Sequence, residues 1–197
     1  MLRSTVIRVA TEEDISDILD IEFGAITPPW THGALLGEIY RCDSFFTVAC
    51  EECVTLSSES GDVNASIYGR GRLAKQETFS ENRSSESHPE SERTDKNGPT
   101  VLGFLILRKM GDDGELLQIA VRSAARRRGV ADLLMGAMLQ YASENALKSI
   151  LLEVRRSNDS AIGLYKKHGF KTVRMRKGYY DSPVEDAVIM TRTLNSP

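Results

Sequence analysis

Apolar residues in the first half of the chain switch between the spacing of strands and that of helices. After a short alternating stretch, Ile15 and Ile18 recur at the spacing of one helix face, and Thr11 can cap that helix. Pro28 and Pro29 cannot continue it, because proline lacks the backbone donor and fixes φ. We therefore expect a strand at 6–9, a helix after Thr11, a second helix from Thr31 to about Tyr40, and a strand at 44–53.

The second half carries sharper patterns. Val130, Leu134, Met138 and Tyr141 share one face of a long helix, and Gly169 stands where the next helix should end in left-handed geometry. Residues 149–154 are almost continuously apolar, which is typical of a strand covered on both faces. We expect strands at 101–110, 115–121, 149–154, 171–175 and 187–193, a turn at 111–114, and helices from 130 and over 159–167.

The predicted order is β-α-α-β-β-β-α-β-α-β-β, which indicates a mixed α/β (α+β) sheet rather than a doubly wound one. Between the second and third strands the composition changes to Ser, Glu, Arg, Asn and Gly, and 80–99 contains no aliphatic or aromatic residue. Such a stretch cannot bury enough apolar surface to offset its ordering entropy. We expect one domain over 1–197, interrupted by a disordered insertion at about 55–99.

Composition and charge narrow the function classes. The net charge of −3 disfavours a general nucleic-acid binder. The sequence contains no apolar run of about 18 residues, so we expect no membrane span. Residues 1–10 lack the apolar region of a secretory signal. Three cysteines make no disulfide framework in a chain of this size, which favours the cytoplasm. Cys50 and Cys53 lack a second pair at zinc spacing, so we expect no metal.

A glycine turn precedes the long helix in the run Arg126-Arg127-Arg128-Gly129-Val130-Ala131. Backbone N–H groups, the helix N-terminus and the flanking arginines can together hold a pyrophosphate. A solvated basic turn is the alternative, since short glycine motifs recur by chance. An RNA-associated adaptor that uses these arginines is a further alternative, and it would bind with a steep salt dependence.

A single carboxylate interrupts the apolar strand at Glu153. It is costly there unless it is paired or used, and partial desolvation would raise its pKa toward the range of a base at neutral pH. The alternative is that Glu153 faces solvent or pairs with Arg155 or Arg174. Tyr165, on the following helix, has the spacing of a core aromatic.

Two of these motifs carry a family resemblance. Arg126-x-x-Gly129-x-Ala131, after a strand at 115–121, resembles the acetyl-CoA motif of the GNAT superfamily, although many members have glycine in place of Ala131. The run Leu-Glu-Val-Arg-x-Ser-Asn-x-x-Ala-Ile-x-Leu-Tyr-x-x-x-Gly-Phe at 152–170 resembles RimI-type ribosomal-protein-alanine and archaeal-type protein N-terminal acetyltransferases. The resemblance implies the GNAT fold, in which the fourth and fifth strands splay apart and helices flank the sheet.

The resemblance also implies an activity: acetyl transfer from acetyl-CoA to a protein N-terminal α-amine, with the N-terminal alanine of ribosomal protein S18 as the suggested target. Glu153 would be the general base and Tyr165 the general acid. Trp30, Tyr179 and Tyr180 would line the peptide groove, unless they are ordinary half-buried aromatics. The implied cofactor-binding residues are Ile119, Ala120 and Val121 for pantetheine, Arg126, Arg127, Arg128, Gly129, Val130, Ala131 and Asp132 for pyrophosphate, and Asn158.

Two other functions remain open on the same fold. The protein could acetylate a lysine side chain or a small amine, or it could be a non-catalytic acyl-CoA-binding subunit. The presence of both Glu153 and Tyr165 counts against the second of these. We expect a monomer or weak oligomer, with no direct contact to nucleic acid or membrane.

Overall fold

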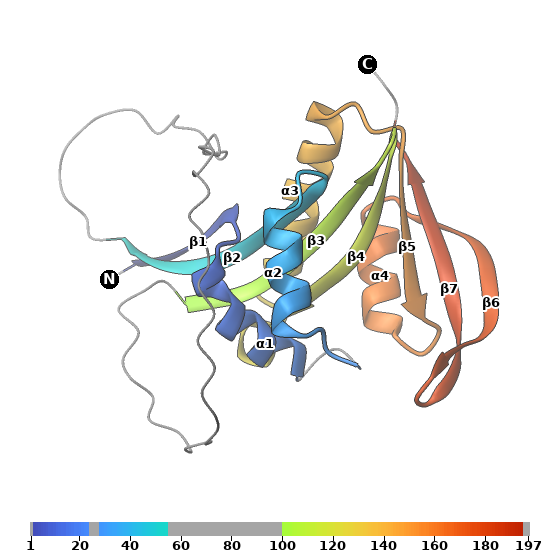
Figure 1. The fold of residues 1–197 in the computed structure, drawn as a ribbon, viewed down its shortest axis with the longest axis horizontal. Coiled ribbons are helices and arrows are strands. Elements are labelled where there is room, and N and C mark those ends of the chain that lie inside the picture. Colours follow the sequence, from blue (N-terminus) through green and yellow to red (C-terminus); the bar gives the residue numbers. More distant parts are fainter. Residues whose placement is uncertain (1, 24–27, 55–99, 195–197) are drawn as a thin grey trace, which may run out of the picture.

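The protein forms one seven-stranded sheet with helices on both faces (Figure 1). The computed structural model describes residues 2–23, 28–54 and 100–194, so the insertion expected at 55–99 lies outside the described residues. The strands are β1 (Leu2–Val9), β2 (Ser44–Val54), β3 (Thr100–Met110), β4 (Asp113–Val121), β5 (Ser149–Arg155), β6 (Lys171–Asp181) and β7 (Val184–Thr193). The helices are α1 (Ile15–Phe23), α2 (His32–Tyr40), α3 (Val130–Glu144) and α4 (Asp159–Lys167), with short 3-10 turns at Glu12–Asp14 and Ser123–Ala125.

The order of elements and the mixed sheet are both confirmed. The strands lie in the order β1-β2-β3-β4-β5-β7-β6, with β4 and β5 parallel and the other neighbours antiparallel. β6 runs to Asp181, well past the predicted end, because it forms a long hairpin with β7. Among the described residues, no helix has the length and apolar character needed to cross a bilayer.

Two hydrophobic clusters hold the layers together, one on each face of the sheet. Leu134, Met138 and Ile150 belong to the cluster under α3 and α4, while Ile18 and Leu35 belong to the cluster under α1 and α2. β3 is central and is buried along most of its length, and its side chains belong to both clusters. Each large aliphatic side chain buried in this way contributes roughly 1.5–3 kcal/mol.

The prediction that β5 is covered on both faces is wrong. Ile150, Leu152 and Val154 are buried under α3 and α4, but Leu151 between them is 36% exposed. The reason is that α1 and α2 pack mainly on β2, β3 and β4. The opposite face of β5 is therefore only partly covered.

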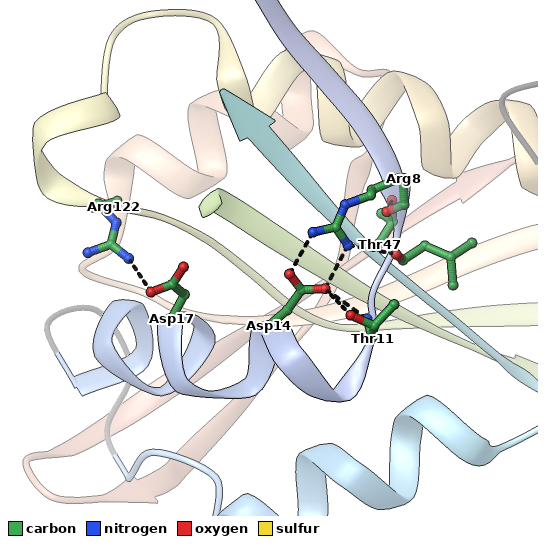
Figure 2. A network of polar contacts seen from close by, with 7 residues as sticks. Arg8, Thr11, Asp14, Asp17, Thr47 and Arg122 are labelled. Carbon is green, nitrogen blue, oxygen red and sulfur yellow. Dashed lines mark hydrogen bonds and ion pairs between the residues drawn. The ribbon is translucent and has the colours of Figure 1, made fainter. Parts of the chain in front are cut away.

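The start of the first helical segment is secured by a buried carboxylate (Figure 2). Asp14 is 4% exposed and accepts two hydrogen bonds from the Arg8 guanidinium, each at 2.7 Å. The backbone N–H of Thr11 also donates to Asp14, at 2.8 Å, as a capping box requires. Thr47 of β2 donates to the Arg8 carbonyl at 2.7 Å, so this network joins β1, β2 and the helix start.

Candidate active site

β4 and β5 are neighbours for only part of their length. They pair over Asp113–Leu116 and Ser149–Leu152, and no pair joins them beyond that point. β4 then continues beside β3 while β5 continues beside β7, and Figure 1 shows the two strands diverging. The predicted splay of the fourth and fifth strands is confirmed.

A β-bulge marks the place where the strands part. Ile106 pairs with Gln118 and Leu107 with Leu116, so Leu117 is an extra residue in β4. A bulge bends its strand and increases the local twist. Because this bulge directly follows the last pair with β5, it turns the rest of β4 away from that strand.

The three residues expected to bind pantetheine lie on the open part of β4. Ile119, Ala120 and Val121 pair with β3 on one side, and the edge toward β5 has no strand partner among the described residues. An open strand edge can bond the amides of an extended molecule, as in strand addition. Gly103 lets β3 approach closely here, because a Cβ on it would lie 2.7 Å from the Ala120 carbonyl oxygen.

The predicted glycine turn is present at the start of α3. Gly129 caps α3 with φ of +81°, and a Cβ there would meet nothing within 4 Å, so the left-handed conformation rather than crowding requires glycine. Arg127 also has positive φ, at +63°. The first N–H groups of the 15-residue α3, which include those of Val130, Ala131 and Asp132, have no acceptor within the helix. Such N–H groups bind anions well.

The charged side chains around this turn are partly engaged within the protein. Arg126 donates to the Val121 carbonyl at 3.2 Å, whereas Arg128 pairs with Glu51 of β2 at 2.6 Å. Arg127 is exposed. Two of the three arginines at the turn are thus engaged within the protein.

Asp132 ties the start of α3 to the end of α4. Its carboxylate lies 2.7 Å from Lys167 Nζ and 2.9 Å from His168 Nε2. The hydrogen bond from Lys167, followed by that from His168, lowers the pKa of Asp132. The Asp132 side chain thus has a structural role, because it joins α3 to the end of α4.

Glu153 occupies the open face of β5, one residue beyond the last pair with β4. Its side chain is 20% exposed, and Arg176 of β6 donates to its Oε1 at 2.7 Å. The partner is therefore neither Arg155 nor Arg174. Arg176 lies just beyond residue 175, where the sequence predicts this strand to end, so spacing along the chain does not indicate it as the partner.

Tyr179 and Tyr180 gather around this carboxylate. The Arg176 guanidinium lies 4.3 Å from the ring centroid of Tyr179, and that of Arg155 lies 4.1 Å from Tyr180. A hydrogen bond to Glu153 raises the pKa of Tyr179. Burial, followed by the charge of Glu153, raises the pKa of Tyr180. The structure thus brings Glu153 and both predicted groove tyrosines together.

Tyr165 lies in the core, and Tyr180 is the one residue of this group that affects its pKa. It is 7% exposed, belongs to the cluster under α3 and α4, and packs beside Phe170 with ring centroids 6.0 Å apart. Burial, with a smaller contribution from Tyr180, raises the pKa of Tyr165 well above its ordinary value. Tyr165 is a core aromatic whose phenol stays protonated at neutral pH.

Asn158 has a local role that the sequence reasoning missed. As the N-cap of α4, it accepts hydrogen bonds from Ala161 N and Ser160 Oγ, both at 3.1 Å, through its side-chain oxygen. Asparagine one residue before a predicted helix is a strong capping signal. The cap engages the side-chain oxygen of Asn158.

Trp30 lies on the side of the sheet that carries α1 and α2. It is half-buried and packs against their cluster, and its backbone N–H donates to Glu22 Oε2 at 2.9 Å. Glu22 was not among the predicted site residues, although an acid on an otherwise apolar helix face could have drawn attention to it. Within the described ranges, no group of three or more His, Cys, Asp or Glu is placed to hold a metal ion.

Comparison with known structures supports the fold over nearly the whole chain. The ribosomal-protein-S18-alanine N-acetyltransferase from Escherichia coli has a TM-score of 0.68 at 20% identity, covering 98% of this chain and 96% of that one. Ard1 from Thermoplasma volcanium also has a TM-score of 0.68, at 24% identity, covering 97% and 98%. At these identities the likeness concerns the fold alone.

Sequence comparison identifies relatives and a family. The [ribosomal protein bS18]-alanine N-acetyltransferase of Haemophilus influenzae is 38% identical over 93 residues, covering 46% of this chain and 63% of that protein. The N-alpha-acetyltransferase of Saccharolobus solfataricus is 44% identical over 82 residues, covering 41% and 48%. The chain thus matches less than two thirds of the length of each. The model of the acetyltransferase (GNAT) family matches residues 65–170, and the chain belongs to that family.

Proposed function

We propose that this protein transfers the acetyl group of acetyl-CoA to the N-terminal α-amine of a protein. The observation that carries the proposal is the end of β4–β5 pairing at Leu116 and Leu152. It opens the edge of β4 at Ile119 and leaves Glu153 on the facing strand just past the split. A donor held along one strand would then meet a base on the other.

The donor half of the site rests on backbone groups. The open edge at Ile119–Val121 is suited to the amides of pantetheine, and the turn at Gly129 with the start of α3 is suited to a pyrophosphate. Arg126 and Arg127 flank that turn. Acetyl-CoA, the co-substrate that the family implies, would supply the acetyl thioester.

The acceptor half centres on Glu153. An α-amine has a pKa of about 7.7–8.0 and is largely protonated at pH 7, so it must lose a proton before it can attack. Glu153 would accept that proton. Arg176 orients the carboxylate by holding Oε1 at 2.7 Å, while Tyr179 and Tyr180 flank it. Positioning of amine and thioester would supply much of the acceleration.

Tyr165 is assigned to the departing thiolate. An ordinary thiol has a pKa of about 8.5, and the pKa of Tyr165 is raised above its own higher ordinary value. Complete proton transfer from Tyr165 to the thiolate would therefore run uphill. Its larger contribution would be a hydrogen bond that stabilises the developing negative charge on sulfur.

The names of the relatives support an N-terminal target. Several are bS18-alanine N-acetyltransferases and others are N-alpha-acetyltransferases. We propose a protein beginning with alanine, such as ribosomal protein S18, as the first target to test. Acetylation of a lysine side chain or of a small amine is the competing outcome.

A peptide panel tests the proposal directly. The peptides differ only in their first residues, and a control peptide has a blocked N-terminus and an internal lysine. We expect acetyl transfer to free N-termini, with alanine among the good substrates, and none to the blocked control. Transfer to the lysine alone would refute N-terminal acetylation.

A charge-removing substitution tests the base. Glu153→Gln should lower turnover by about 10²-fold or more, the usual worth of a general base, while acetyl-CoA still binds. Glu115→Gln is the matched control, because Glu115 lies on the neighbouring strand opposite Leu151. Equal effects of the two substitutions would mean that local charge, not proton transfer at Glu153, sets the rate.

We also propose that the 197 residues form one domain with 55–99 as an insertion. β2 and β3 flank this segment as antiparallel neighbours, with Glu51 paired to Thr100, so the chain leaves and re-enters the sheet at adjacent points. Deleting 80–99 should leave activity and melting temperature nearly intact. A lost melting transition would show that the segment is structural.

A further inference from the structure

The strongest unexplained feature lies beside Trp30, in the carboxyl group of Glu22. Glu22, near the C-terminal end of α1, is fully buried, with 0% exposure. Its Oε2 accepts the Trp30 N–H at 2.9 Å. Its Oε1 is also buried and has no hydrogen-bond partner of good geometry among the described residues.

Gln118 of β4 is the side chain that faces this carboxyl group. It interacts with Glu22 and is itself only 8% exposed, and its own Oε1 likewise has no partner in the described part of the chain. The Gln118 amide donates toward Glu22, and one oxygen of each side chain stays buried without a partner of good geometry among the described residues. A proton on Glu22 would add a second donor to this pair, which the unpartnered Gln118 oxygen can accept.

Among the described residues, no cation is placed to balance an ionised Glu22. On the elements packed against α1, Arg122 pairs with Asp17 at 3.6 Å (Figure 2), Arg108 of β3 pairs with Glu38 of α2, and Arg8 pairs with Asp14. β4 presents the uncharged Gln118. Burial raises the pKa of Glu22, against smaller opposing effects of Trp30 N–H and Gln118.

We propose that Glu22 is a positioning residue that, as a neutral carboxyl group, joins Trp30 to Gln118. It would thereby hold the Trp30 side of the peptide groove against β4, the strand assigned to acetyl-CoA. Gln118 directly follows the bulge at Leu117 and precedes Ile119, the first residue assigned to acetyl-CoA. Glu22 would thus set the distance between the two substrates without touching either. The inference rests on the proposed function for where the peptide and acetyl-CoA bind, but the contact of Glu22 with Trp30 and Gln118 does not depend on it.

The contact can be tested without any substrate, because Trp30 is the only tryptophan in the chain. Its fluorescence reports on its surroundings directly. Glu22→Gln mimics the neutral carboxyl group: its oxygen can accept from Trp30 and its amide can donate to Gln118. Glu22→Ala removes both links and is the disrupting counterpart.

We expect Trp30 emission in the unmodified protein to shift as pH rises and Glu22 ionises. In Glu22→Gln the emission should match that of the unmodified protein at low pH and stay constant as pH rises. Urea unfolding should agree: with its folded pKa raised, Glu22 gives stability that is complete below its unfolded pKa and is lost as pH rises through the folded value. Glu22→Gln should lack this loss.

Kinetics then tests the positioning role. Glu22→Ala should raise KM for the acceptor peptide by about tenfold, the loss expected for a hydrogen-bonded support, with a much smaller change in KM for acetyl-CoA. Glu22→Gln should restore the peptide KM. The fluorescence and unfolding results stand even if the acceptor proves not to be a protein N-terminus.

Two results would overturn the inference. If Glu22→Gln perturbs Trp30 emission as strongly as Glu22→Ala, the group works as a charged carboxylate. If Glu22→Ala folds and leaves the emission unchanged, Glu22 does not hold Trp30. Should Glu22→Ala fail to fold, the pH titration of the unmodified protein against Glu22→Gln still decides the matter.

Discussion

Adding a single methyl group at Gly103 tests how the donor strand is held. In Gly103→Ala the new Cβ would lie 2.7 Å from the Ala120 carbonyl oxygen and 3.2 Å from Val121 Cγ2. Both contacts are shorter than a relaxed carbon contact of about 3.5–4.0 Å. The nearer atom belongs to the backbone, so it cannot move aside by a change of rotamer. β4 itself must shift at the residues assigned to acetyl-CoA.

The expected cost follows from that geometry. Overpacking in a tight site destabilises by about 1–3 kcal/mol, and in a chain of this size each kcal/mol lowers Tm by roughly 2–4 °C. We therefore expect a Tm lower by about 2–12 °C. Because Gly103 pairs with Val121, the affinity for acetyl-CoA should fall as well.

Thermal unfolding and calorimetric titration with acetyl-CoA measure the two effects. Gly136→Ala is the matched control: Gly136 lies in α3, is exposed, and a Cβ there meets nothing within 4 Å. This control should gain about 0.5–1 kcal/mol, because alanine favours the helix. A Gly103→Ala protein with unchanged Tm and unchanged acetyl-CoA affinity would refute the idea that close β3–β4 contact sets the donor edge.

Three further substitutions probe the other supports. Burial opposes ionisation of Asp14, but hydrogen bonds from Arg8 and Thr11 outweigh this effect and lower its pKa. The stabilisation by Asp14 should therefore be present above about pH 4 and be lost as pH falls through the folded pKa. The free energy of urea unfolding of Asp14→Asn should be lower than that of the parent at pH 7 and equal to it in acid, and a pH-independent difference would contradict this. Asn158→Ala should lower the free energy of unfolding by about 1 kcal/mol, because the N-cap is lost. Asn158→Ser keeps the cap but removes the amide, so weaker acetyl-CoA binding by this stable variant would reveal a contact between the amide and the cofactor. Tyr165→Phe should keep the fold and lower kcat by about 10²-fold, and an unchanged kcat would exclude the phenol from the reaction.

The sequence by itself determined the elements, their order and the family. Periodicity is a local property, and the α4 prediction at 159–167 matches the structure because capping by Asn158 and termination at Gly169 both act within a few residues. The stretch at 152–170 also carries Glu153 and Tyr165 within one continuous run. Local spacing was therefore enough to propose the chemistry, and the family comparison agrees with the membership it implied.

The tertiary structure alone decided how these residues meet. The bulge at Leu117 depends on register between β3 and β4, and the split beyond Leu116 depends on how that bulge turns the strand. The partners of Glu153 and Trp30, which are Arg176 and Glu22, come from other elements. Spacing along the chain cannot specify such contacts, because register, twist and the packing of helices on a sheet are set by many distant side chains together.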